Sequence, residues 1–169
     1  MDRPFSLLTD ELPRSVFIQD GTIEIDIKTD TLTALQCLSM LDNDDIPDNV
    51  RISCVIETIL AEGEEIPPDL YLDVFSAILD YLKGFPVEGG TKSREPVFSY
   101  AQDHAYVVAG FRQAYGMSLE DIHKTHWWEF QALLSGLPEG TRLSQIMRIR
   151  SMDIDPKASP AEKLRIQKA

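Results

Sequence analysis

The chain has 169 residues, of which 43% are hydrophobic and 26% charged, which is typical of one globular domain and excludes a disordered or membrane-embedded chain. Its formal net charge of -12 opposes nucleic-acid binding, because phosphate contacts require Lys and Arg to displace counterions. No apolar run approaches the roughly 18 residues that span a bilayer, and no signal peptide is recognisable, so we expect a cytoplasmic protein without a membrane partner.

A β-hairpin is predicted in the N-terminal arm, residues 1–28. The apolar run Val16–Ile18 is followed by Asp20-Gly21, a pair typical of a tight turn, and then by isoleucines that alternate with polar residues over 23–27. Two strands alone are not stable in water, so we expect helices from the rest of the chain to cover one face of the hairpin.

Three helices are predicted in the first helical half, residues 30–84. Asp30 or Thr31 can cap the first helix, the second stops near Gly63, and Pro67-Pro68 opens the third. We interpret their apolar residues at helical spacing as core. These residues are Leu32, Leu35, Leu38 and Leu41 in the first helix, Ile52, Val55, Ile56, Ile59 and Leu60 in the second, and Tyr71, Val74, Phe75, Ile78, Leu79 and Leu82 in the third.

Glycines and prolines mark residues 85–96 as a loop inside the domain, with a domain boundary there as the alternative. The second helical half, residues 97–152, is predicted to hold the remaining helices. The first of them should pack through Phe98, Ala101, Ala105, Val108, Phe111 and Tyr115 and end at Gly116, and Thr141 can cap the last. We therefore expect a mainly α single-domain bundle of six to seven helices over residues 1–169, with a short hairpin.

The charge is unevenly distributed along the chain. From Arg142 onward there are seven Lys or Arg against three acidic residues, whereas the preceding part is strongly acidic. The basic tail, residues 153–169, can be a solvated helical end, or it can dock on an acidic surface of this chain or of a neighbour.

The two tryptophans are adjacent, and on a helix they must point in different directions. Trp127 falls on one face with Phe130 and three leucines, so we expect Trp127 and Phe130 in the core. Trp128 points to roughly the opposite side and needs a second partner, either another helix of the same fold or another protein chain, because tryptophan is enriched in interface hot spots.

Arg150 falls among apolar residues of the last predicted helix, where its guanidinium would be partly desolvated. A desolvated charge must find a partner of opposite sign, and Asp103 on the opposing Ala-rich helix is one candidate among many acids. We therefore assign Asp103 and Arg150, with Trp127 and Phe130, a structural role.

Catalytic motifs are not recognisable in the sequence. It contains no Gly-rich phosphate loop, no GxSxG elbow and no HExxH zinc motif. His123 and His126 lie three residues apart near two acids, but two ligands do not fix a zinc ion. We favour a histidine at a helix start, hydrogen-bonded or solvated, beside a capping carboxylate, and we expect no enzyme activity, metal or cofactor. Cys37 and Cys54 are expected to be reduced and buried.

Several unusual runs of the second half resemble the bacteriophage family named after gene product fifteen. They are YAQD at 100–103, AGF at 109–111, HWWEFQALLSGLP at 126–138 and IMRIRSMD at 146–153. The resemblance implies a non-catalytic protein of siphophage or prophage tail morphogenesis that works in the host bacterial cytoplasm. Such proteins look like tail assembly chaperones, which keep the long tape measure protein soluble.

The implied partners are the tape measure protein or other tail proteins, and self-association is a further candidate. Under this hypothesis the contact residues would be Trp128 and, in and before the basic tail, Arg148, Lys163 and Arg165. The alternatives are a structural connector or completion protein of the tail and, more remotely, a metal-dependent enzyme that uses His123 and His126.

Overall fold

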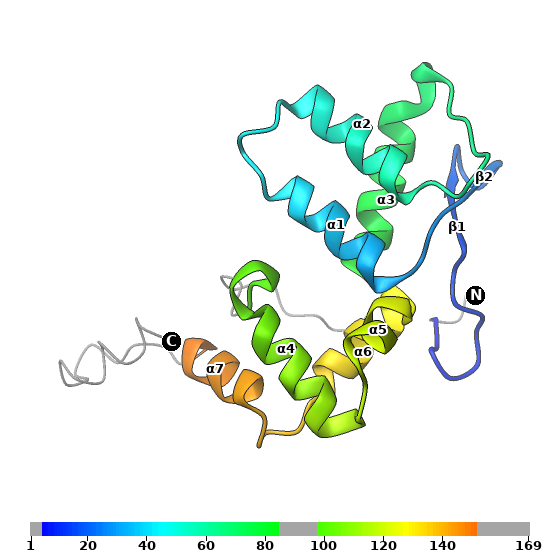
Figure 1. Cartoon of the computed structure of the whole chain (residues 1–169). Coiled ribbons are helices and arrows are strands. Elements are labelled where there is room, and N and C mark those ends of the chain that lie inside the picture. The colour runs from blue at the N-terminus through cyan, green and yellow to red at the C-terminus, as the bar shows by residue number, and fades with distance from the viewer. Residues whose placement is uncertain (1–4, 85–97, 152–169) are drawn as a thin grey trace. The chain divides into compact units, whose positions relative to one another are not determined.

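A computed structural model describes residues 5–84 and 98–151, so the predictions for the loop 85–96 and the tail 153–169 lie outside the described residues (Figure 1). The described part is mainly helical, with seven α-helices and one two-stranded antiparallel sheet, which confirms the predicted fold class. The elements are β1 (Ser15–Ile18), β2 (Ile23–Asp26), α1 (Thr31–Leu41), α2 (Asp48–Ile59), a 3-10 turn (Pro68–Leu70), α3 (Tyr71–Lys83), α4 (Tyr100–Tyr115), α5 (Leu119–Lys124), α6 (Trp127–Ser135) and α7 (Arg142–Ser151).

Residue contacts divide the chain into two compact units, each of which is discontinuous in sequence. The first unit comprises Met1–Gly89 and Glu120–Ala132, and the second comprises Gly90–Leu119 and Leu133–Ala169. The single domain remains a prediction, and the units are described separately below. Among the described helices, none combines the length and the apolar character needed to cross a membrane.

The hairpin forms where the sequence predicts it. Val16 pairs with Ile25, and both side chains are buried. Asp20 and Gly21 have φ values of 54° and 85°, and Thr22 N donates to Gln19 O at 3.1 Å. A turn with two positive φ values is the type in which Asp-Gly is favoured. Helix α3 packs against β1, so the expected helical cover is confirmed.

Helices α2 and α3 bury most of the predicted apolar stripes. The other predicted residues are half-buried, namely Ile52, Tyr71, Phe75 and Leu79. Helix α2 packs against both α1 and α3, and Val55, Ile56 and Ile59 are at most 1% exposed. Val74 and Ile78 of α3 are fully buried. The apolar spacing of these helices thus identifies the core of the first unit.

The prediction that the leucine stripe of α1 faces the core is wrong. Leu32 is exposed and the other three leucines are half-buried, whereas Ala34 and Cys37 are fully buried. The predicted cap is confirmed, because Asp30 accepts from Thr33 N at 2.9 Å. Thr31 fixes the rotation of the helix, since its N–H and its hydroxyl both donate to Thr125 O. The small side chains of α1 therefore face the core.

The predicted packing face of α4, in the second unit, is also partly wrong. Ala101 and Ala105 are exposed, whereas Asp103, Val107, Gly110 and Phe111 are buried. Helix α7 packs against α4. Gly110 allows Leu137, which lies between α6 and α7, to approach α4 closely, because a Cβ on Gly110 would lie 3.3 Å from Leu137 Cδ1. The ion pair of Asp103 described below, rather than the alanines, sets the rotation of this helix.

Candidate functional site

The two indoles of α6 bind the C-terminal end of α3. Trp127 Nε1 donates to Leu82 O and Trp128 Nε1 donates to Tyr81 O, each at 3.0 Å. Carbonyl groups in the last turn of a helix have no hydrogen-bond donors within that helix, so side chains or water must provide the donors. The adjacent tryptophans therefore satisfy two successive carbonyl groups of α3.

Trp127 is the buried member of the pair. It is 1% exposed and stacks on Phe130, with ring centroids 5.6 Å apart and an interplanar angle of 17°. Phe130 is fully buried. The expectation that both residues belong to the core is confirmed.

Trp128 is half-buried and has partners within its own chain. Its ring stacks on Tyr81, with centroids 5.9 Å apart, and meets the edge of Phe5 at 5.0 Å. Burial, with a smaller effect of Asp30, raises the pKa of Tyr81 well above its ordinary value of 10, so the phenol stays neutral. Trp128 thus takes the intramolecular option, while its role in binding a partner remains a prediction.

Gly84 allows α6 to approach the end of α3 closely. It has a φ of +100°, and a Cβ at this position would overlap Gln131, whose Nε2 lies 3.4 Å from Leu82 O. Glycine is the residue that adopts this backbone conformation without strain.

Substituting Gly84 by alanine is expected to lower the free energy of unfolding by about 1–3 kcal/mol, because it combines backbone strain with the overlap at Gln131. Gly63→Ala is the matched control, since Gly63 also has a positive φ but a Cβ there meets nothing within 4 Å. Urea unfolding followed by circular dichroism measures both. Equal losses would show that contact with α6 does not constrain Gly84.

His126 acts as a side-chain cap at the start of α6. Trp128 N donates to its Nδ1 at 3.1 Å, and its Nε2 lies 2.9 Å from Pro13 O. Because Nδ1 accepts, Nε2 carries the hydrogen and donates to Pro13. Within the described residues, no group of three or more His, Cys, Asp or Glu side chains is placed to hold a metal ion. Of the two options predicted for a helix-start histidine, His126 takes the hydrogen-bonded one.

Main-chain pairing ties α6 to the start of α1. Trp127 N donates to Thr29 O at 2.8 Å, and Thr31 N donates to Thr125 O at 2.9 Å. The hydroxyl of Tyr81 also donates to Thr29 O, at 3.3 Å. The N-terminal arm, α1, α3 and α6 therefore meet in one place, which we call the indole junction, defined by Thr29, Tyr81, His126, Trp127 and Trp128.

The predicted pair of Arg150 and Asp103 is confirmed in the second unit. Arg150 Nη1 donates to Asp103 Oδ2 at 2.6 Å and Nη2 donates to Oδ1 at 3.1 Å. The Asp103 side chain is 1% exposed and that of Arg150 is 22% exposed. Ser99 N adds a hydrogen bond to Asp103 Oδ2 at 3.0 Å.

The environment of Asp103 favours the ionised carboxylate. Burial opposes ionisation, but the hydrogen bonds from Arg150 and Ser99 and the charge of Arg150 together outweigh it. They hold the pKa of Asp103 below its ordinary value of 3.8. The pair therefore remains ionised at neutral pH.

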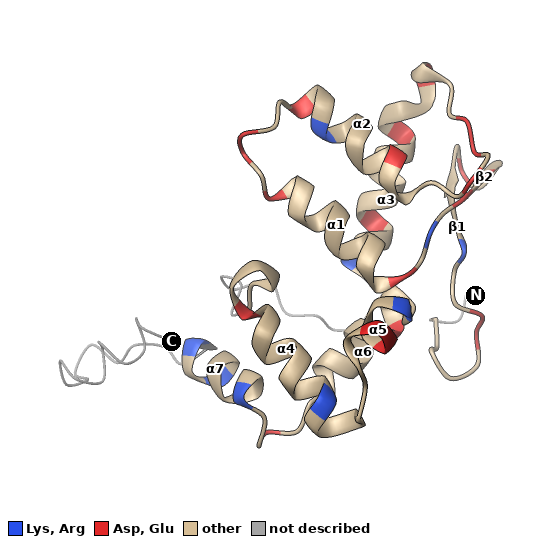
Figure 2. Cartoon of the chain, viewed as in Figure 1, with Lys and Arg blue, Asp and Glu red and all other residues tan. Residues whose placement is uncertain are grey.

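The remaining predicted contact residues are basic. Arg148 is exposed on α7, whose basic positions are blue in Figure 2. It lines a surface pocket with Arg142 and Gln145. Lys163 and Arg165 lie outside the described residues. The structure therefore places one of the three predicted basic contacts.

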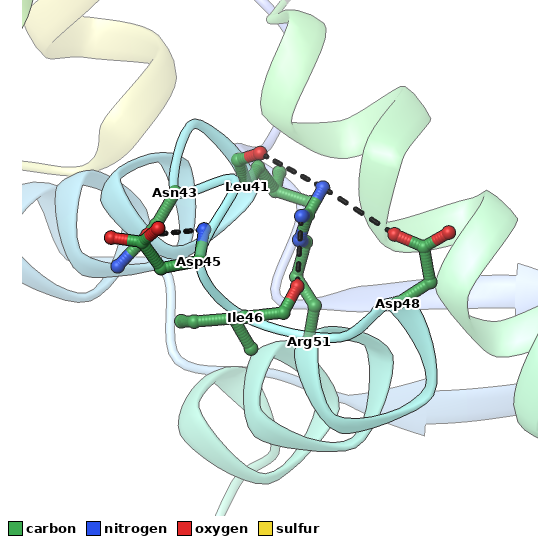
Figure 3. Close-up of polar contacts among 6 residues, drawn as sticks. All are labelled: Leu41, Asn43, Asp45, Ile46, Asp48 and Arg51. Carbon is green, nitrogen blue, oxygen red and sulfur yellow. Dashed lines mark hydrogen bonds and ion pairs between the residues drawn. The ribbon is translucent and has the colours of Figure 1, made fainter.

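Arg51 was not identified from the sequence, yet it organises the loop between α1 and α2 (Figure 3). Its guanidinium donates to Ile46 O at 2.9 Å and to Leu41 O at 3.5 Å, and it lies 3.7 Å from Asp48. The available signal was a lone arginine beside a run of acids. Its neighbours are loop carbonyls, so its role is structural.

The two cysteines differ in burial. Cys37 is fully buried, as expected, with its thiol 3.8 Å from Val55 O, whereas Cys54 is half-buried and both are free thiols. Burial raises the pKa of Cys37 to about 12, so its thiol stays protonated at neutral pH.

Comparison with known proteins gives one match. The model of a family described as Bacteriophage Gp15 protein matches residues 8–169, nearly the whole chain. No curated protein and no solved structure matches the chain.

Proposed function

Because the chain belongs to the bacteriophage Gp15 protein family, we propose that it acts in tail morphogenesis as an assembly chaperone of the tape measure protein. The match over residues 8–169 is the observation that carries this proposal, together with the tail role that the family resemblance implies. In this role the chain would bind its client in the cytoplasm of the infected cell and leave when the tail tube has formed.

Exposed apolar side chains in the first unit support such a role. Leu8 is 96% exposed, Leu72 on α3 is 70% exposed and Phe17 on β1 is 56% exposed. Large apolar side chains at a surface can cover an apolar stripe of a helical client. The net charge of -12 would keep the complex soluble.

Co-expression with the tape measure protein of the same phage tests the proposal. The chain should copurify with this client and increase the fraction of the client in the supernatant. A client that is equally soluble without the chain, and no complex, would refute the proposal. Purified virions should lack the chain, since stoichiometric amounts there would instead support a structural tail component.

Leu72→Ser is expected to reduce the soluble fraction of the client while changing the free energy of unfolding by less than about 0.5 kcal/mol, because the side chain is exposed. Ser76→Ala, at another exposed position of α3, is the control and should leave client solubility unchanged. A Leu72→Ser chain that is as effective as the wild type would exclude this part of α3 from the client surface.

A further inference from the structure

Strand β1 has one free edge. Ile27 N donates to Arg14 O at 3.0 Å, which places the hydrogen-bonding groups of Arg14, Val16 and Ile18 toward β2. The main-chain groups of Ser15 and Phe17 consequently point away from β2. In the described part of the chain neither residue forms a main-chain hydrogen bond on this outer edge.

The neighbouring edges are occupied, which confirms this orientation. On the outer edge of β2, Ala61 N donates to Asp26 O at 3.1 Å, and Lys28 N donates to Ile59 O at 2.7 Å. On the outer edge of the chain before β1, Pro13 O accepts from His126. The free edge is therefore limited to two N–H and two C=O groups, those of Ser15 and Phe17.

We propose that a second copy of this chain pairs with this edge, antiparallel, so that Ser15 of each copy faces Phe17 of the other. Directly opposed residues in such a ladder exchange both N–H···O=C bonds, so the two Ser15–Phe17 pairs would form four hydrogen bonds. Val16 would lie on the two-fold axis. The two short sheets would become one four-stranded sheet, which is more stable than two separate hairpins.

The side chains along β1 favour a second copy over an unrelated strand. In the antiparallel arrangement the exposed Phe17 lies beside the small Ser15 of the partner, so its ring gains cover without a clash. Arg14 lies before the strand and Asp20 after it, and both are exposed. The two-fold axis therefore places each Arg14 at the same end of the ladder as the turn of the other copy, which carries Asp20, whereas a parallel arrangement would place like charges together.

The same features limit the ladder to its two central pairs. Pro13 has no N–H and its carbonyl is occupied by His126, while Gln19, with φ 52°, already turns the chain away. With so few bonds, and a net charge of -12 on each copy, we expect a concentration-dependent dimer.

Sedimentation velocity of the full chain over a concentration series tests the dimer. The wild type should shift from monomer to dimer mass, and Phe17→Pro should remain a monomer. This substitution removes an outward N–H without removing a bond to β2, and proline is tolerated on an edge strand. Phe17→Thr keeps the N–H and is the matched control, which should still dimerise. Circular dichroism melting checks that each variant is folded.

Charge reversal tests the dimer a second time, with substitutions that lie outside β1. Arg14→Glu and Asp20→Lys should each weaken the dimer several-fold, and the double variant should restore it, because the attraction across the two-fold axis returns. Equal weakening in the double variant and the singles would overturn the register.

The dimer would be overturned if the chain sediments as a single species of monomer mass up to a protein concentration of about 1 mM. A dimer that does not form at this concentration has an association free energy weaker than about -4 kcal/mol. A dimer that Phe17→Pro does not affect would overturn the use of this edge. If the chain alone is a monomer and Phe17→Pro abolishes copurification of the client, the edge binds the client instead. Dimer formation does not depend on chaperone activity, so the two proposals can fail separately.

Discussion

Trp127→Ala is expected to lower the free energy of unfolding by about 3–5 kcal/mol, the largest effect of any substitution considered, because a large fully packed side chain is removed. The variant loses the stacking on Phe130 and the hydrogen bond to Leu82 O. Urea unfolding followed by far-ultraviolet circular dichroism measures the loss. A folded domain is stabilised by about 5–15 kcal/mol, so this loss removes a large share of the stability.

The neighbouring indole provides the control. Trp128→Phe keeps an aromatic ring against Tyr81 and removes the hydrogen bond to Tyr81 O, which still accepts from Gly84 N at 3.1 Å. The expected loss is about 1 kcal/mol. Comparable losses for Trp127→Ala and Trp128→Phe would contradict the division of the pair into a buried and a half-buried member.

Asp103→Ala is expected to reduce the free energy of unfolding at pH 7 by about 2–3 kcal/mol, because it leaves the Arg150 guanidinium partly buried without its carboxylate. Thermal unfolding at pH 7 checks the value. Replacing both partners by apolar residues, as in Asp103→Leu with Arg150→Met, should recover much of the loss. A double variant as unstable as Asp103→Ala alone would show that lost packing, not an unpaired charge, is responsible.

The contribution of Asp103 should depend on pH in one direction. Its pKa is lower in the folded chain than its ordinary value of 3.8, so the folded state favours the ionised form. The stabilisation is therefore fully present above that value and is lost as the pH falls through the folded-state pKa. The difference in stability between the wild type and Asp103→Asn should shrink as the pH is lowered below 3.8. A constant difference would contradict the assignment.

Local patterns in the sequence predict much of the fold. The Asp20-Gly21 turn, the Asp30 cap and the apolar spacing of α2 and α3 act within a few residues of one another, so their structural consequences can be read from the sequence. The partner of Arg150 was predictable for a different reason. A positively charged side chain on an apolar helix face requires an acidic partner on the opposing helix, and this requirement reduces the number of candidate partners.

The errors occur where distant segments decide the orientation of a helix. The rotation of α1 depends on the bonds from Thr31 to Thr125, and that of α4 depends on the pair of Asp103 with Arg150. No local period encodes such contacts, and the leucines of α1 suggested the wrong face. For the same reason the sequence predicted that Trp127 is core but not that both indoles bind the end of α3.

The composition of the indole junction has a consequence for synthesis on the ribosome. The junction joins residues around Thr29 and Tyr81 to residues 126–128, and the segment between them includes the whole of α4. A nascent chain that has emerged only as far as α3 has its last carbonyl groups without their indole donors. The first unit can therefore be completed only after α6 has left the exit tunnel, and a fragment cut after α3 would lack the segment that closes its core.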